Sequence, residues 1–248
     1  MTARYSGNVH GMHVLTFHER GSESPVVERL WTARSERAGV FSSIASPHWE
    51  MVVTRRHDTT SLTVRGPETK ATEAQCPADG EWVAIRFRAG TYWPECLPAT
   101  LRDRRDLTLP PAGARSFWLN GSAWEYPTYD NADTFVARLV RQGVIGRDPI
   151  VESVLRGAGQ ACSERSVQRR FARATGITHA SYRTIERART AATLLREGVS
   201  ILDVVHRIGY YDQAHLTRTF KRLIGQTPAD VARATPQLSF LYKTDPLP

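Results

Sequence analysis

The stretch from 201 to 234 carries the strongest pattern in the sequence. It reads ILDVVHRIGYYDQAHLTRTFKRLIGQTPADVARA. Ser200 and Asp212 are residue types that cap helix N-termini, and Gly209 suits the left-handed turn that ends a helix. After Asp212, apolar residues recur at i, i+4 and i+7: Leu216, Phe220 and Leu223. We therefore predict two helices joined by a tight turn and followed by a closing helix.

The predicted second helix of this unit has two different faces. Opposite its apolar side lie small, hydrogen-bonding and cationic residues: Ala214, Thr217, Arg218 and Lys221. Such a face suits the major groove of DNA, where Arg reads guanine and small side chains permit close approach. The alternative for any cationic helix face is that it is only solvated.

The same pattern occurs once before, displaced by 49 residues toward the N-terminus. The equivalent positions include a cap, a core aromatic residue and a stop glycine: Ser163 with Asp212, Phe171 with Phe220, and Gly176 with Gly225. Because chance rarely aligns such features together, we interpret the pattern as an internal duplication. The earlier unit has its own polar arc: Arg165, Gln168, Arg169 and Arg173. Two such helices would enter successive major grooves, which lie about 34 Å apart.

The two units and the helix between them resemble the double helix-turn-helix domain of the AraC/XylS family of bacterial transcription regulators. The first unit carries SERSVQRRFARATG, and the second carries ILDVVHRIGYYDQAHLTRTFKRLIGQTP, which matches the family pattern more specifically. The resemblance covers roughly the last hundred residues. It implies a sequence-specific transcription regulator that places two recognition helices in double-stranded DNA.

The resemblance also implies which residues contact DNA. Base contacts map onto Arg165, Gln168 and Arg169 in the first unit and onto Gln213, Ala214, His215, Thr217 and Arg218 in the second. We assign phosphate contacts, which position a protein without specifying sequence, to Arg170, Arg173, Arg183, Lys221 and Arg222. The first unit departs from the family pattern because VLRGAGQACSERS puts two glycines before the reading helix. Either its support helix is 149–156 with a longer turn, or the first reader is held less rigidly.

The distribution of charge agrees with a polyanionic partner. The chain has a formal net charge of +8 over 248 residues. Residues 148–235 have 14 Lys and Arg against 8 Asp and Glu, a net of +6, whereas residues 1–147 have 18 against 16. The excess charge therefore lies where DNA binding would need it.

We predict a two-domain α+β protein. Residues 1–127 form a β-rich domain, 128–147 a linker with a helix, 148–235 the all-α double helix-turn-helix domain, and 236–248 a tail. The strand candidates are short and separated by turn chemistry: 12–17, 26–32, 50–55, 61–64, 82–87 and 116–119. This spacing suggests a small barrel or sandwich. In the resembled family such a domain is often a cupin-like barrel that senses a small molecule or mediates dimerisation.

Two further helices are predicted from apolar spacing. One starts at Asn131 or Asp133 and runs through Val140, and it would either pair with its counterpart in another subunit or pack on its own domain. The other, 181–196, would join the two readers and fix their separation. The protein is accordingly expected to be a monomer or a homodimer.

The expected location is the cytoplasm. No apolar run approaches the ~18 residues of a membrane span, and the N-terminal residues lack the hydrophobic segment of a signal peptide. Cys76, Cys96 and Cys162 are odd in number and widely spaced, which suits a reducing compartment. No cofactor, metal or membrane partner is expected, and RNA polymerase is a candidate partner of any regulator of this kind.

A small-molecule effector site is the expectation for the β-rich domain. Large aromatic residues with a few polar groups suit a ligand pocket. The candidates are Trp49, Glu50, Trp82 and Arg86. In the alternative reading the tryptophans only fill the core of a small barrel.

Two other functions compete with the regulator. The first is a cupin-type metalloenzyme whose helical part only targets DNA, with metal ligands among His10, His13, His18, His48, Glu50 and His57. The usual closely spaced histidine pair followed by glutamate is not formed, so we expect no enzymatic activity. The second is a non-specific architectural protein, which Gln168, Gln213 and Thr217 disfavour because these residue types read base edges.

Overall fold

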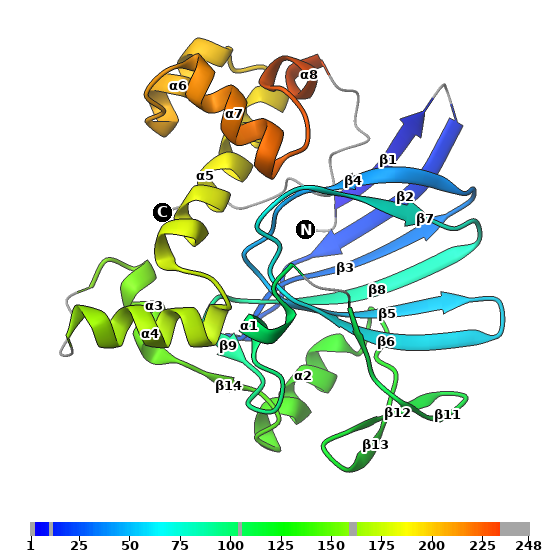
Figure 1. Ribbon diagram of the computed structural model, residues 1–248. Helices are drawn as coiled ribbons and strands as arrows, with labels where there is room; N and C mark the ends of the chain where they lie inside the picture. The colour runs from blue at the N-terminus through cyan, green and yellow to red at the C-terminus, as the bar shows by residue number, and fades with distance from the viewer. Residues whose placement is uncertain (1–2, 10–11, 104–105, 159–162, 234–248) are drawn as a thin grey trace.

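The computed structural model describes residues 3–9, 12–103, 106–158 and 163–233. A β-rich part and a helical part lie side by side, and the helical part stands along one side of the sheet (Figure 1). The predicted tail 236–248, His10 and Cys162 lie outside the described residues.

The main sheet has seven antiparallel strands. Their order is β1 (Ala3–Val9), β2 (Met12–Arg20), β3 (Val27–Ser35), β8 (Gly80–Phe87), β5 (Glu50–Arg56), β6 (Thr59–Arg65) and β10 (Leu107–Thr108). A separate pair is formed by β4 (Gly39–Ser43) and β7 (Thr72–Cys76). Over the described residues the strands do not close into a barrel, so an open sheet or sandwich replaces the barrel alternative.

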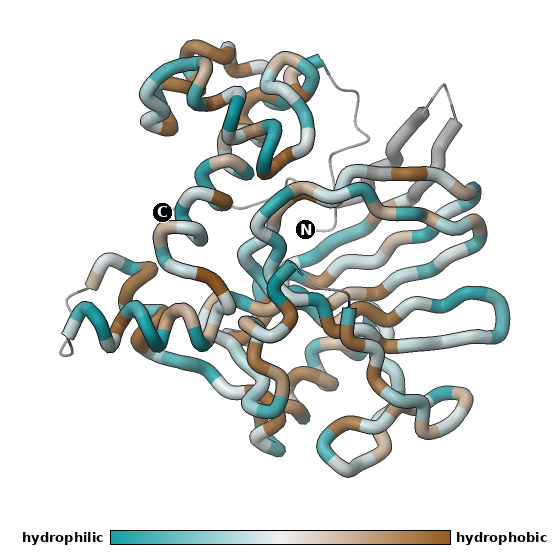
Figure 2. Tube along the Cα trace, in the orientation of Figure 1, coloured by the Kyte–Doolittle hydropathy of each residue, from teal (hydrophilic) through white to brown (hydrophobic). Residues whose placement is uncertain are grey.

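Alternation along β8 separates the two faces of the main sheet. Val83, Ile85 and Phe87 are buried on one face, and Trp82 and Arg86 lie on the other, as the sequence predicts. The buried face is covered by α2 (Ala132–Arg141) and by a small sheet of β11 (Pro111–Gly113), β12 (Ser116–Leu119) and β13 (Ser122–Glu125). Figure 2 shows hydrophobic residues where α2 meets the sheet, whereas the β5–β6 turn is hydrophilic.

Helix α2 settles one of the alternatives left by the sequence. Phe135, Val136 and Leu139 are buried in the core of the β-rich part, so the helix packs on its own domain. Val140, which the pattern places on the same apolar stripe, is 45% exposed. The chain then forms β14 (Gly146–Arg147), which pairs with β9 (Thr91–Tyr92) and ties the linker to the β-rich part.

The helical part contains both predicted units. Its helices are α3 (Pro149–Leu155), α4 (Glu164–Thr175), α5 (His179–Arg196), α6 (Ile201–Ile208), α7 (Gln213–Leu223) and α8 (Pro228–Arg233). Helix α3, with Asp148 as its N-cap, contacts α4 in the position expected for the support helix of the first unit, and part of the turn between them lies outside the described residues. Among the described helices, none is long and apolar enough to cross a lipid bilayer.

The core of the helical part includes residues from the β-rich part. Ile44 and Ala45, which follow β4, are buried and belong to the same hydrophobic cluster as Phe171 of α4 and Phe220 of α7. A short helix, α1 (Pro98–Leu101), lies against α4 (Figure 1). The two parts therefore share one of the two hydrophobic clusters that the described residues form.

Candidate nucleic-acid interface and ligand site

Each reading helix is fixed at its start by a side-chain cap. The Ser163 hydroxyl accepts a hydrogen bond from the Ser166 amide at 3.4 Å, and the Asp212 carboxylate accepts one from the His215 amide at 2.6 Å. Gly176 and Gly209 end helices with φ of 80° and 74°, a region that favours glycine. The duplicated sequence thus gives two helices with equivalent beginnings at the two ends of α5 (Figure 1).

Most of the predicted base-contacting side chains are exposed. On α4 these are Arg165, Gln168 and Arg169, and on α7 they are Gln213, Ala214 and Arg218. His215 and Thr217 are half-buried. The His215 ring packs against Tyr210 with 5.3 Å between ring centroids, and the Thr217 hydroxyl donates to the Gln213 carbonyl oxygen at 2.8 Å. These two side chains therefore also make contacts within the helical part, and their base contacts stay a prediction.

All five residues predicted to contact phosphates are exposed, but one of them is paired within the protein. Arg173, Arg183, Lys221 and Arg222 are exposed. Arg170 is exposed too, but its Nε and Nη2 donate to the two carboxylate oxygens of Asp148 at 3.0 and 3.1 Å. Because Asp148 also caps α3, Arg170 joins the support helix to the reading helix of the first unit, a role that spacing alone does not reveal.

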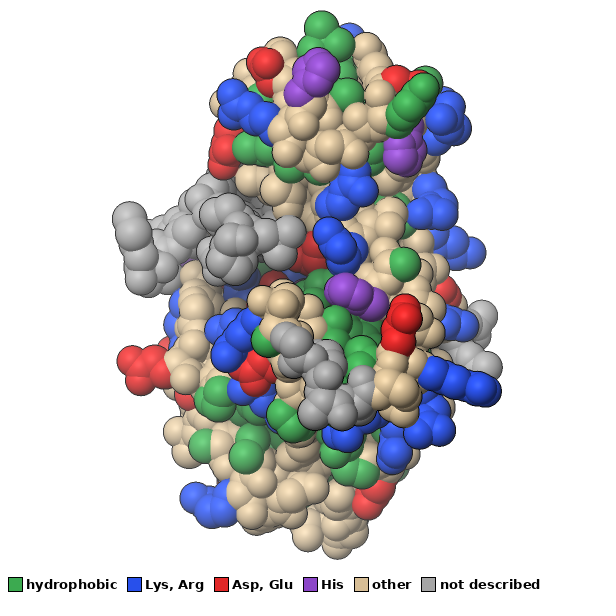
Figure 3. Space-filling model, turned by 90° about the vertical axis from the view of Figure 1, so that its left-hand side faces the viewer, with side chains coloured by type: hydrophobic (Ala, Val, Ile, Leu, Met, Phe, Trp, Pro, Cys, Tyr) green, Lys and Arg blue, Asp and Glu red, His purple; other side chains and the backbone are tan. Residues whose placement is uncertain are grey.

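Two arginines between the units were not among the predicted contacts. Arg187 and Arg207 line a hollow of about 380 Å³ together with Arg183. Arg187 donates to the Gly209 carbonyl oxygen at 2.7 Å and lies over the Tyr210 ring. Figure 3 shows Lys and Arg side chains in the centre and along one edge of this face of the molecule. The signal in the sequence is the four-residue spacing of Arg183 and Arg187, which places both on one side of α5.

The predicted effector residues do not all meet. Glu50 and Arg86 are cross-strand partners with 3.4 Å between Oε2 and Nε, and the Trp31 indole donates to Glu50 at 3.3 Å. Trp82 lies on the same face, and its ring covers Gly80. Trp49 is on the opposite face, 4% exposed and stacked on Phe87, so it fills the core.

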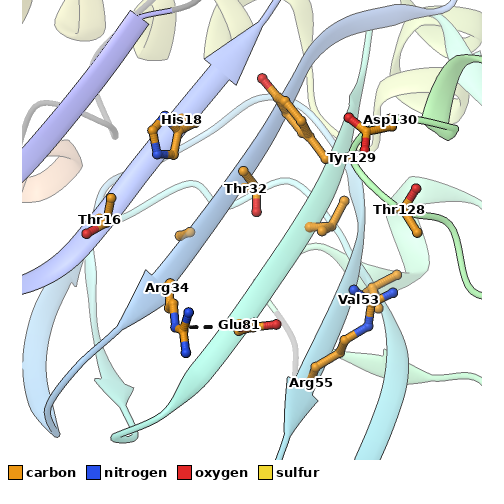
Figure 4. Close-up of a pocket in the computed structure, with 12 residues that line it drawn as sticks. Thr16, His18, Thr32, Arg34, Val53, Arg55, Glu81, Thr128, Tyr129 and Asp130 are labelled. Atoms are coloured by element: carbon orange, nitrogen blue, oxygen red, sulfur yellow. Dashed lines mark ion pairs between the residues drawn. The ribbon is translucent and has the colours of Figure 1, made fainter.

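A hollow of about 430 Å³ lies on the Val83 face of the sheet, against residues 128–130 (Figure 4). Val53 and Val83 contribute apolar surface, and His18, Arg55 and Tyr129 are among the polar side chains around it. The Tyr129 hydroxyl is buried without a hydrogen-bond partner in the described part of the structure. The hollow falls within the size range of small-molecule sites, and the sequence gives no indication of it.

The candidate metal ligands whose side chains the structure describes are dispersed. His18 lines the hollow of Figure 4, His57 lies at the β5–β6 turn, and His48 is 7% exposed between the two parts of the molecule. Over the residues that the structure describes, no three His, Cys, Asp or Glu side chains form a group suited to a metal ion. The described donor residues therefore do not fit a cupin-type metal site.

A buried group of charges joins the β-rich part to α5. His48 Nε2 lies 3.4 Å from Glu28 Oε2, and its Nδ1 contacts the Phe87 carbonyl oxygen. Arg189 of α5 is 1% exposed, and its Nη1 donates to the Ala45 carbonyl oxygen at 3.3 Å. Burial raises the pKa of Glu28, but the charges of His48, Arg86 and Arg189 outweigh it and hold that pKa below its usual value.

The fold of the helical part, with two capped reading helices whose polar faces are exposed, is that of a helix-turn-helix domain. Residues 159–234 match the family described as a helix-turn-helix domain. This match agrees with the resemblance of the helical part to the double helix-turn-helix domain of AraC/XylS regulators.

Two curated relatives are similar to parts of the chain. The HTH-type transcriptional regulator RipA of Corynebacterium glutamicum is 37% identical over 151 residues, which are 59% of this chain and 44% of that protein. The regulator of the same name from Corynebacterium diphtheriae is 39% identical over 67 residues, 27% of this chain and 20% of that protein. The match thus covers less than half of either relative. No solved structure is significantly similar to the chain.

Proposed function

We propose that the protein is a sequence-specific transcription regulator that reads two half-sites with α4 and α7. The observation that carries the proposal is the pair of capped, duplicated helices. Both helices expose Arg and Gln side chains, and α7 also exposes Ala214. Arg pairs with guanine and Gln with adenine in the major groove. Arg183, Arg187 and Arg207 would hold the phosphates between the two grooves. A cytoplasmic location and RNA polymerase as a partner belong to the proposal.

Selection of bound sequences from random duplex DNA tests this proposal. We expect a motif with two unequal halves about one helical turn apart, because α4 and α7 present different side chains. A recovered pool with no sequence preference would instead support the architectural alternative.

The proposal includes a small-molecule effector, for which the β-rich part offers two places. One is the face of Glu50, Trp82 and Arg86, and the other is the hollow beside Tyr129. Thermal unfolding in the presence of individual polar metabolites would detect a ligand, because binding to the folded state raises Tm. The effect of such a ligand should disappear in Arg86→Gln if the first place binds it and in Arg55→Gln if the second does. A ligand effect that survives in both variants would exclude both places.

A further inference from the structure

The β-rich part holds the C-terminal end of the second reading helix. The last four carbonyl groups of a helix have no partner within that helix. At the end of α7, the Leu223 carbonyl accepts a hydrogen bond from the Ala45 amide at 2.8 Å, and the Arg222 carbonyl accepts one from the Ala71 amide at 2.8 Å. Two amides of the β-rich part thus satisfy carbonyls in the last turn of α7.

The end of the first reading helix also lies against the β-rich part. A Cβ on Gly176 would lie 2.8 Å from the backbone of Pro98, at the start of α1. A Cβ on Gly225 would lie 3.2 Å from the Ala71 side chain. These two glycines occupy the same position in the duplicated units, 49 residues apart. Each unit therefore turns its stop glycine toward the β-rich part.

The helix between the readers is attached to the same frame. Arg189 lies in the middle of α5 and donates a hydrogen bond to the carbonyl oxygen of Ala45. The amide N–H of the same residue, Ala45, donates to the Leu223 carbonyl at the end of α7. The Arg189 Nε lies 3.5 Å from Glu186 Oε1 on the same helix. The side chain is almost fully buried, so its position is determined by both parts of the molecule. Three attachments to one body fix the geometry of the readers more firmly than α5 alone would.

We propose that the β-rich part is a spacing gauge, which makes the protein discriminate operators by the distance between their half-sites, with Ala71 and Arg189 as positioning residues. This inference rests on the proposed DNA-binding function. When the spacing of the half-sites prevents a rigid pair of readers from binding both at once, the affinity for DNA falls by about 100-fold or more. Readers joined only by α5 would tolerate a shifted half-site better.

The test uses the full chain and the motif obtained by selection. Four duplexes are compared: the motif itself, the motif with two base pairs added or removed between its halves, and a duplex with one half only. Two base pairs rotate one half by roughly 70° about the DNA axis. Ala71→Pro removes the amide donor to Arg222, and the matched control Ala71→Gly keeps it. Arg189→Met provides an independent second variant, with thermal unfolding to establish that each variant is folded.

We expect the wild type and Ala71→Gly to lose about 100-fold in affinity on either shifted duplex. In Ala71→Pro and Arg189→Met the loss should fall to about 10-fold, while affinity for the one-half duplex stays within about twofold. An equal spacing penalty in all four proteins would overturn the gauge and leave DNA binding intact, as would a variant that weakens every duplex alike. A wild type that binds no duplex selectively would overturn the proposed function itself.

Discussion

Arg218 and Lys221 lie on the same helix but are expected to do different work. Arg218 is exposed on the face of α7 that carries Gln213 and Ala214, whereas Lys221 belongs to the last turn. We predict that Arg218→Ala weakens DNA binding by about 1 to 3 kcal/mol and relaxes the preference at one base pair. Lys221→Ala should weaken all sequences alike and reduce the salt dependence. Equilibrium binding to single-base variants at several salt concentrations measures both effects, and the same uniform loss in both variants would contradict these roles.

Glu68 gives a prediction about pH. Burial raises the pKa of its carboxyl group to about 6, an effect that the hydrogen bond from Ser43 only partly offsets. Because the folded-state pKa exceeds the unfolded value, this group favours folding most below about pH 4.5, and that contribution is lost as the pH rises through about 6. Glu68→Gln should therefore stabilise the protein above pH 7 by about 1 to 2 kcal/mol.

Urea unfolding of both proteins at pH 5 and pH 7.5 checks the prediction for Glu68. The stability difference between variant and wild type should be clearly larger at pH 7.5 than at pH 5, since the other titrating groups are common to both. A difference that does not change with pH would mean that Glu68 has an ordinary pKa.

At the scale of single elements, α5 is the helix whose continuity matters most. Ala188 lies in its middle and is fully buried, so Ala188→Pro should cost roughly 3 kcal/mol and reduce DNA binding although no contacting atom is removed. His179→Pro is the matched control, because it occupies the first helical position and its equivalent in the second unit, Pro228, is already a proline. Circular dichroism and duplex binding should separate the two variants. Similar losses in both would show that the position of the proline is unimportant.

The sequence predicts most elements whose signals are local. Ser163, Ser200 and Asp212 mark helix starts because each caps a backbone amide three residues further along the chain. The strand in WVAIRFR is equally clear, since its alternating residues face a buried and a half-buried side. The strands β4 and β7 are not predicted because their residues are mostly small or polar and their pairing joins distant segments. Arg170 shows the same limit in the site, because its partner Asp148 is 22 residues away.

The whole molecule shares a core across the boundary that the sequence predicts between its domains. Ile44 comes from the β-rich part, yet it is 3% exposed among residues of the reading helices. Ile44→Ala should destabilise the helical part by about 2 to 5 kcal/mol because it leaves a cavity there. Hydrogen exchange of the α4 and α7 amides should become faster in this variant. As a control, Val40→Ala changes a residue of the β-rich part that is 56% exposed and should leave those amides unchanged.

The prediction for Ile44 fails if exchange speeds up only in the β-rich part. That result would mean that the helical part keeps a complete interior of its own.

The seat of Ile44 and Ala45 among the reading helices also limits how this chain can be recombined. A chimaera that joins residues 148–235 to an unrelated domain would lack the buried side chains of residues 44 and 45. It would also lack the two backbone amides that donate hydrogen bonds to the end of α7. A functional graft would have to bring those donor loops with it, or supply substitutes for them.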